Sequence, residues 1–211
     1  MYTAPTFDWS GPERAHYYRA LADALSLSDL SVVEPIRILL KMPCTDMIMP
    51  SRTMTVEQQV IDWIAAGEQP HLSHFLRSLF GVGFCSKQLP AIPACAAFYV
   101  RDAEEIRERL KEAYERWGYH EHQVFAPDCE GTGYIARQLA FAAHCIENGC
   151  GEWGDMESAA QLLRESLYDW APLFARALVV SRVHPAVMFV GMKLECLLDH
   201  EHELGGLPVA D

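Results

Sequence analysis

The stretch EGTGYIARQLAFAAHCIENG, residues 130–149, decides the fold. It predicts a helix entered through a glycine-containing loop, because its apolar residues recur at helical spacing. Thr132 is placed to cap the first turn, and Gly149 stands where a left-handed C-cap residue is expected. Several alanines on this helix would let a neighbouring helix approach closely. We therefore expect 130–149 to contain the central helix of a helical protein.

Amphipathic patterns on both sides of this stretch predict further helices. Their expected starts are Ser10, Val32, Thr55, Pro70, Asp102, Asp155, Pro172 and Pro185, and two of them are expected to end at Gly67 and Gly118. The segment 42–54 is expected to be a loop whose methionines pack loosely or offer an adaptable apolar surface. No alternating strand pattern of useful length occurs outside residues 98–100, so we predict an all-α fold.

We expect a single-domain helical bundle of about eight to ten helices, since one core can grow to roughly 250 residues. The chain has 211 residues, half of them hydrophobic. Residues 1–80 would form the N-terminal helices, 81–101 a long connection interrupted by Pro90 and Pro93, and 102–199 the C-terminal helices. Residues 200–211 would form a loose acidic tail. The last helix is apolar nearly all round and is expected to be buried.

No feature of the sequence marks the chain for export or for a membrane span. Its longest apolar run, 186–192, is far shorter than the ~20 residues of a membrane span. Its first residues lack the basic region and the apolar region of a secretory signal. Seven cysteines without a CxxC motif suggest reduced thiols. We therefore expect a cytoplasmic protein.

The charge of the chain restricts the class of its partner. The formal net charge is −12, which argues against nucleic acid, because a phosphate backbone needs a basic surface. An acidic field favours the encounter with a basic peptide segment. The alternative is that the acidic surplus serves solubility alone.

Motifs of enzymatic chemistry do not occur. The chain has no Gly-rich phosphate loop, no G-x-S-x-G elbow and no H-E-x-x-H, so we expect no enzymatic activity and no cofactor. The alternative is a metal-binding or thiol redox-sensing protein that uses His120, His122 and Cys129, with Cys145 and Cys150 following. The two histidines are predicted to lie in a loop, and no second paired motif completes a tetrahedral ligand set. We therefore predict no metal site.

An ordered set of motifs runs through the second half of the chain. In chain order they are Leu79-Phe80, LPAIP (89–93), FYVRDAEE (98–105), AAHCIENG (142–149), Trp170, Phe174 and His184-Pro185. Across residues 75–198 the chain thereby resembles the TorD/DmsD family of cytoplasmic chaperones for molybdenum-cofactor oxidoreductases, to which the NarJ-type nitrate reductase chaperones are related. Each motif is weak alone, whereas their order and spacing together are fairly specific.

Two positions depart from the pattern of this family. Its loop before the central helix has the sequence Glu-Pro-x-Asp-His, whereas residues 130–134 here are EGTGY, so only the glutamate is retained. The pair Pro127-Asp128 is a candidate for a shifted remnant. Leu76 stands where the family has an aromatic residue. The chain therefore resembles a divergent member whose client differs from the best-known ones.

The resemblance implies a helical protein without catalytic chemistry. It would bind the apo catalytic subunit of a molybdenum oxidoreductase, and often its twin-arginine signal peptide, until the molybdopterin guanine dinucleotide is inserted. Such a peptide has a basic end and an apolar body, so its receptor needs carboxylates beside an apolar groove. The candidate client-binding residues are Leu76, Leu79, Phe80, Pro90, Asp128, Glu130, Gly131, Gly133, Tyr134, Trp170, Phe174 and His184. A monomer and a helix-exchanged dimer are both compatible with this expectation.

A structural role is the alternative for several of these residues. Trp170 and Phe174 lie one helical turn apart, as core residues do. His184 precedes Pro185 and suits the start of a helix. Glu130 is equally compatible with a solvated surface position.

Overall fold

The computed structural model describes residues 12–26, 32–42, 50–67, 79–80, 92–120, 133–148 and 162–203. Within these ranges the chain is helical and contains no strand, which confirms the predicted all-α class. The α-helices are α1 (Pro12–Leu25), α2 (Val33–Lys41), α3 (Pro50–Ala66), α5 (Ala103–Arg116), α6 (Ile135–Glu147), α8 (Ala171–Ser181) and α9 (Pro185–Glu203). Two shorter segments are the 3-10 turn η2 (Ala96–Phe98) and the π-helical segment η4 (Arg164–Tyr168).

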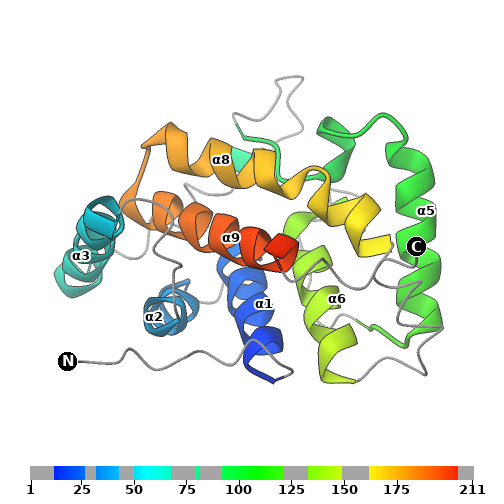
Figure 1. Ribbon diagram of the computed structural model, residues 1–211, viewed down its shortest axis with the longest axis horizontal. Coiled ribbons are helices and arrows are strands. Elements are labelled where there is room, and N and C mark those ends of the chain that lie inside the picture. Colours follow the sequence, from blue (N-terminus) through cyan, green and yellow to red (C-terminus); the bar gives the residue numbers. More distant parts are fainter. Residues whose placement is uncertain are drawn as a thin grey trace.

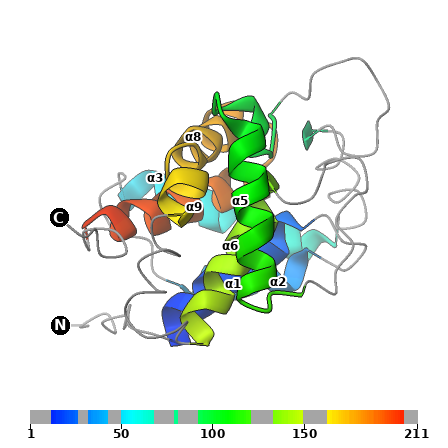
Figure 2. The same cartoon turned by 90° about the vertical axis from the view of Figure 1, so that its right-hand side faces the viewer.

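Two helix pairs make most of the core (Figure 1). α1 packs along α6, and α8 packs along α9; these are the most extensive contacts between described helices. α9 also contacts α1, α2 and α3, so it connects the two pairs with the N-terminal helices. α5 lies at the end of the molecule beside α6, where the ring of Tyr114 is 4.7 Å from the ring of Phe141 (Figure 2).

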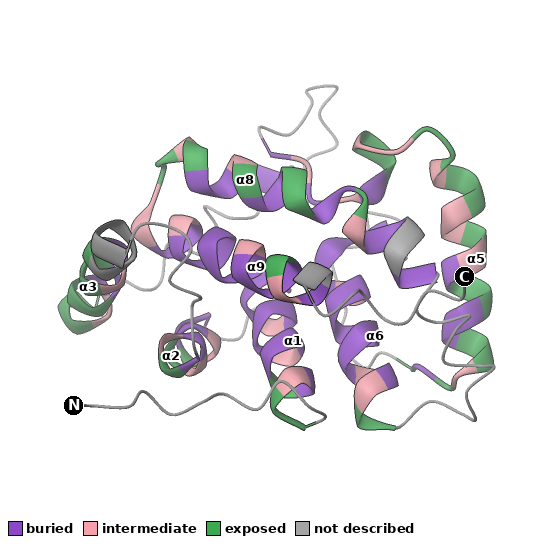
Figure 3. Cartoon of the chain, in the orientation of Figure 1, coloured by how far each residue is buried: buried purple, intermediate pink, exposed green. Residues whose placement is uncertain are grey.

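α9 is buried along most of its length, as its apolar composition predicts. Among its described side chains only Asp199 is exposed (Figure 3). The buried apolar residues of α9 are Ala186, Val187, Phe189, Val190, Met192, Leu194, Cys196, Leu197 and Leu198. Burial of about 25 cal/mol per Å² of apolar surface makes this helix a main source of the stability of the fold.

The predicted alanine-lined contact of the central helix is made with α1. α6 buries Ala136, Ala140, Ala142 and Ala143, and α1 buries Ala15, Ala20, Ala22 and Ala24. Small side chains let two helix backbones come close, which is why this pair has the most extensive contact in the described fold. The helix expected within 130–149 is thus confirmed as α6.

A glycine fixes the distance between α8 and α9. A Cβ atom added to Gly191 would lie 2.7 Å from the Cβ of Leu178 and 3.0 Å from the carbonyl oxygen of Ala175. Real Cβ atoms essentially never approach other atoms so closely. The missing side chain at 191 therefore lets α8 lie directly on α9.

Some predicted helix starts are wrong. α3 begins at Pro50 instead of Thr55, so the last part of the predicted loop 42–54 is helical. Proline suits the first turn of a helix, because its missing N–H has no partner there anyway. Asp102 precedes α5 but makes no capping hydrogen bond with its side chain, and Tyr134 takes the N-cap position of α6 instead of Thr132.

The predicted start of the loose tail, at residue 200, is too early. α9 continues to Glu203, so residues 200–203 belong to this helix. Glu201 is buried there and pairs with Arg14 of α1, which explains why an acidic stretch stays helical. Residues 98–100, the best candidate for a strand, do not form one. Phe98 is the last residue of the 3-10 turn η2, and Tyr99 and Val100 come directly after it.

Glycine ends two helices as predicted. Gly67 after α3 and Gly118 after α5 have φ angles of 74° and 61°, a conformation that favours glycine. The helix expected from Pro70 is described only at residues 79–80, and the connection 81–101 only from residue 92. None of the described helices has the combination of length and apolarity that a membrane crossing requires.

Candidate functional site

Trp170 and Phe174, the strongest motif residues, lie in the core. Trp170 is the N-cap residue of α8, and its indole N–H donates a hydrogen bond to the carbonyl oxygen of Ser166. Both side chains are fully buried. The ring of Tyr99 stacks on Trp170 at 5.1 Å, and Phe80 lies 5.7 Å from Phe174. We call Phe80, Tyr99, Trp170 and Phe174 the aromatic cluster.

The structure thus brings together predicted groove residues from distant parts of the chain, but inside the protein. Phe80 is buried, and the carbonyl oxygen of its neighbour Leu79 accepts a hydrogen bond from the N–H of Ile92 at 3.1 Å. This bond joins the residues before the long connection 81–101 to the described part of that connection. The aromatic cluster therefore positions α8 and the chain around η2, and it offers no open groove in this arrangement.

Tyr134 and Gly133 also serve packing. The Tyr134 hydroxyl donates a hydrogen bond of 2.7 Å to the carbonyl oxygen of Leu25, which ties the start of α6 to the end of α1. An isolated antiparallel bridge pairs Tyr134 with Cys95. A Cβ atom at Gly133 would lie 3.4 Å from the Sγ atom of Cys95, so this glycine faces a side chain of the same protein.

His184 acts as a helix-start residue. Its Nδ1 atom accepts a hydrogen bond of 3.1 Å from the N–H of Ala186 in the first turn of α9. Its ring lies edge-on to Trp63 of α3, with 5.1 Å between centroids. The histidine therefore connects the beginning of α9 with α3, which agrees with the structural alternative for this residue.

Burial limits what the described candidate residues can contact in this arrangement. Leu79, Phe80, Tyr134, Trp170 and Phe174 are buried, so their side chains have no surface for a client in this arrangement. Gly133 and His184 are also described and have the contacts given above. The other candidates lie outside the described residues, and their client-binding role stays a prediction. They are Leu76, Pro90, Asp128, Glu130 and Gly131.

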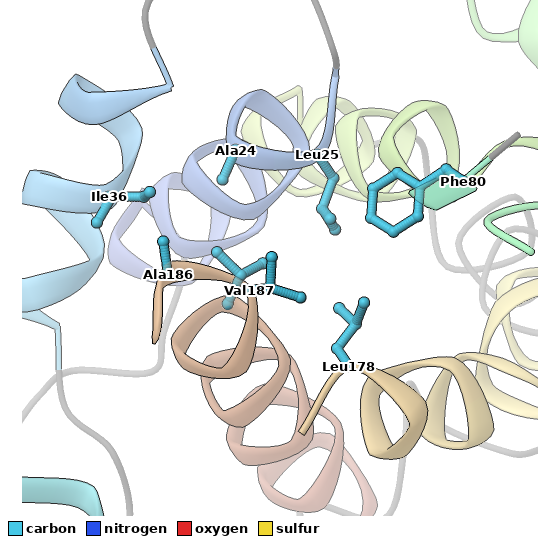
Figure 4. A pocket seen from close by; sticks show the side chains of 8 residues that line it. Ala24, Leu25, Ile36, Phe80, Leu178, Ala186 and Val187 are labelled. Atoms are coloured by element: carbon cyan, nitrogen blue, oxygen red, sulfur yellow. The ribbon is translucent and has the colours of Figure 1, made fainter. Parts of the chain in front are cut away.

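A small apolar cavity lies between α1, α2, α8 and α9 (Figure 4). Its volume is about 10 Å³, which is the space of roughly one water molecule. Its lining is Ala24, Leu25, Ile36, Phe80, Leu178, Ala186, Val187 and Val190. A space of this size without polar partners is a packing defect and is too small for a peptide side chain.

Exposed aliphatic side chains gather on the outer side of α8. Leu173 and Val180 are 60% and 57% exposed, and Val183 in the turn after the helix is also exposed. Arg176 lies between the first two, and Arg182 precedes Val183. We call Leu173, Arg176, Val180, Arg182 and Val183 the outer face of α8. Sequence reasoning did not predict this face, because exposed and buried aliphatic residues look alike in the sequence of an apolar helix.

Several buried polar side chains also escaped prediction. Lys193 is only 1% exposed, and its Nζ donates a hydrogen bond of 2.6 Å to the carbonyl oxygen of Met42. The Oε1 atom of Glu57 lies 3.3 Å from the same Nζ. Gln138 is buried, and its Nε2 donates to the carbonyl oxygen of Gly133 at 3.0 Å. The only sequence signal for Lys193 was its place within an otherwise apolar helix.

The described residues offer no ligand set for the alternative of a metal-binding or thiol redox-sensing protein. No group of three His, Cys, Asp or Glu side chains suited to a metal occurs among the described residues. Nε2 of His144 lies 3.0 Å from the carbonyl oxygen of Trp117. Burial raises the pKa of the Cys95 thiol, although backbone hydrogen bonds partly oppose it, so Cys95 is a poor thiolate. His122, Cys129 and Cys150 lie outside the described residues.

Charge in the described parts is nearly balanced, whereas the acidic surplus of the chain lies mainly outside them. The segment 121–132 contains Glu121, Asp128 and Glu130 and no lysine or arginine.

Comparison of the chain with protein-family models, with curated proteins and with solved structures found no match.

Proposed function

We propose that this protein is a cytoplasmic maturation chaperone of the TorD/DmsD type. It binds the apo catalytic subunit of a molybdenum oxidoreductase, together with its twin-arginine signal peptide, and holds it until the cofactor is inserted. It performs no reaction itself. The ordered motifs of the sequence suggest this function, and the all-helical fold is compatible with it.

The observation that carries the proposal is the construction of α8. Trp170 and Phe174 fix the inner side of this helix, and His184 with Pro185 starts the helix that supports it. The outer face of α8 nevertheless exposes three large aliphatic side chains. A protein that holds an unfinished subunit must present apolar surface to it, and exposed apolar groups that cluster commonly mark such contacts. In this proposal the motif residues position the contact surface and do not touch the client.

The acidic segment 121–132 is the counterpart for the basic end of a leader. Its three carboxylates attract arginines and accept their hydrogen bonds in charge-assisted form. Because no lysine or arginine offsets these carboxylates, the negative charge of the segment also speeds its encounter with a cationic peptide. The chain thus contains a carboxylate-rich segment for the basic end of a leader, besides the exposed aliphatic face of α8 for the apo subunit.

Co-expression with a molybdenum-enzyme catalytic subunit tests the proposed function. The tagged chain should capture the subunit in its cofactor-free form and lose it once the cofactor has been inserted. A subunit without its leader, expressed in parallel, separates binding of the leader from binding of the mature domain. Glu130→Lys should weaken capture of the leader-bearing form, and Glu34→Lys on the exposed side of α2 is the matched control. Capture that is equal for the cofactor-free and the loaded subunit would contradict the proposal.

A further inference from the structure

We propose that the outer face of α8 is a docking surface for a client segment that carries both aliphatic and carboxylate side chains. This inference rests on the proposed function and makes it more specific. It assigns α8 to the mature domain of the client, and it leaves the basic leader to other parts of the chain.

The aliphatic part of the face is arranged along one line of the helix. Leu173 and Val180 are seven residues apart, which places them on the same side of α8. With a rise of 1.5 Å per residue they are about 10 Å apart along the axis. Val183 extends the exposed aliphatic surface into the turn that follows. A partner segment of two to three helical turns has the length to cover all three.

The support below this face is closely packed. On the inner side of α8, Ala171, Phe174, Ala175, Leu178 and Val179 are buried. Gly191 lets α9 lie directly against them. A face that is already held in its binding conformation loses little conformational entropy when a partner docks.

The charges on this face select the partner. Arg176 lies three residues after Leu173 and four before Val180, and its side chain is 64% exposed. Its Nη1 atom forms an ion pair of 3.7 Å with Oε1 of Glu195 on α9, and most of the guanidinium stays exposed beside this pair. Arg182 ends α8 in a left-handed conformation with φ 51° and is also exposed. Asp169, one turn before Leu173, is the exposed acid at the other end of the face.

Two exposed guanidinium groups, Arg176 on α8 and Arg182 directly after it, accompany these aliphatic side chains, although the chain as a whole has a net charge of −12. A guanidinium can bind a carboxylate through two parallel hydrogen bonds, so a segment with Asp or Glu beside its aliphatic residues complements this face. A twin-arginine leader would instead bring like charges together, which costs free energy. The outer face of α8 therefore selects an acidic and aliphatic segment.

Two synthetic peptides test this selection on the full chain. Both should be helical and about 15 residues long, with the same leucine positions, one carrying glutamates and the other lysines. We expect the glutamate peptide to bind at least about tenfold more tightly in fluorescence anisotropy, and to weaken as salt is raised. The double variant Arg176→Glu/Arg182→Glu should reverse the preference. Arg37→Glu on α2 is the matched charge control.

Substitution of the aliphatic residues tests the same face independently. Leu173→Asp and Val180→Asp should each lower the affinity for the glutamate peptide about tenfold or more. Ile61→Asp, at an exposed site on α3, should leave this affinity unchanged. Circular dichroism should show that the variants are folded. Sedimentation should show whether a second copy of the chain covers the face. Equal binding of both peptides, unchanged binding in the α8 variants, or self-association through this face would overturn the inference. If these variants still capture the apo catalytic subunit normally, the docking surface is wrong while the proposed function stands.

Discussion

The guanidinium of Arg14 on α1 pairs with the carboxylate of Glu201 near the end of α9, across almost the whole length of the chain. Glu201 is 2% exposed and Arg14 is 17% exposed. Burial opposes the charge on Arg14, but Glu201 outweighs it and the pKa of Arg14 is raised. The pair therefore fastens the first described helix to the last.

Removal of one partner of this pair should destabilise the protein. Arg14→Met leaves the Glu201 carboxylate buried without its cation, and we expect a loss of about 2–4 kcal/mol in the free energy of unfolding. The double variant Arg14→Met/Glu201→Leu should lose less than the single variant, since no buried charge then remains. Urea unfolding of the three proteins measures both effects. A double variant that is less stable than Arg14→Met would show that the pair stabilises the fold beyond compensating its own burial.

The Tyr18 and Tyr168 hydroxyls, which share a hydrogen bond, should make the protein sensitive to high pH. Burial, followed by the neighbouring Tyr168, raises the pKa of Tyr18 well above 10, and burial also raises the pKa of Tyr168. The unfolded chain releases these protons at pH about 10, whereas the folded chain keeps them. The stabilisation is therefore complete below this pH and is lost as the pH rises above it.

The double variant Tyr18→Phe/Tyr168→Phe should have a flatter alkaline stability profile than the unmodified protein. Arg14, which also hydrogen-bonds to Tyr168, keeps Glu201 as its partner when both hydroxyls are removed, so stability near neutral pH should change little. Urea midpoints measured at neutral pH and above pH 10 give the comparison. Parallel profiles in the two proteins would mean that other groups cause the loss of stability in alkali.

Gly191→Ala should destabilise the contact between α8 and α9. Alanine favours a helix by about 1 kcal/mol over glycine, but its Cβ would meet Leu178 and the Ala175 carbonyl. We expect overpacking to dominate, with a net loss of about 1–2 kcal/mol. Leu178→Gly in the same chain removes the Cβ atom nearest to the new methyl group, so the two substitutions should cost less together than their sum. Strict additivity in thermal unfolding would argue against a shared contact.

Lys193→Met should release α3 from α9. The substitution leaves the Met42 carbonyl without its donor and removes the ion pair with Glu57. A buried unpaired acceptor costs about 1–3 kcal/mol, and α9 is the main contact of α3. Hydrogen exchange should therefore accelerate in α3 more than in α1 or α6. Uniform acceleration across all helices would mean that α3 is not held separately.

The all-helical class could be predicted because it depends on local patterns. The spacing of apolar residues in α6 and the glycines at 67 and 118 act within a few residues of the chain. The predicted start of α3 at Thr55 is too late, because Pro50, in the expected loop 42–54, fits the first turn of a helix.

The interior arrangement depends on long-range partners and could not be predicted. Glu201 looked like part of an acidic tail until Arg14 was placed beside it. Trp170 and Phe174 looked suited to a groove, because an aromatic pair at helical spacing is the same in a core and in a binding site. The outer face of α8 became visible only when the direction of each aliphatic side chain was known.

The affinity of this protein for two forms of one molybdenum-enzyme catalytic subunit tests the central claim most directly. Titration calorimetry should compare the cofactor-free subunit with the same subunit after cofactor insertion. We predict that the cofactor-free form binds at least about a hundredfold more tightly, a difference of about 2.7 kcal/mol. Equal affinity for both forms, or no binding to either, would contradict the proposal that the chain is a maturation chaperone.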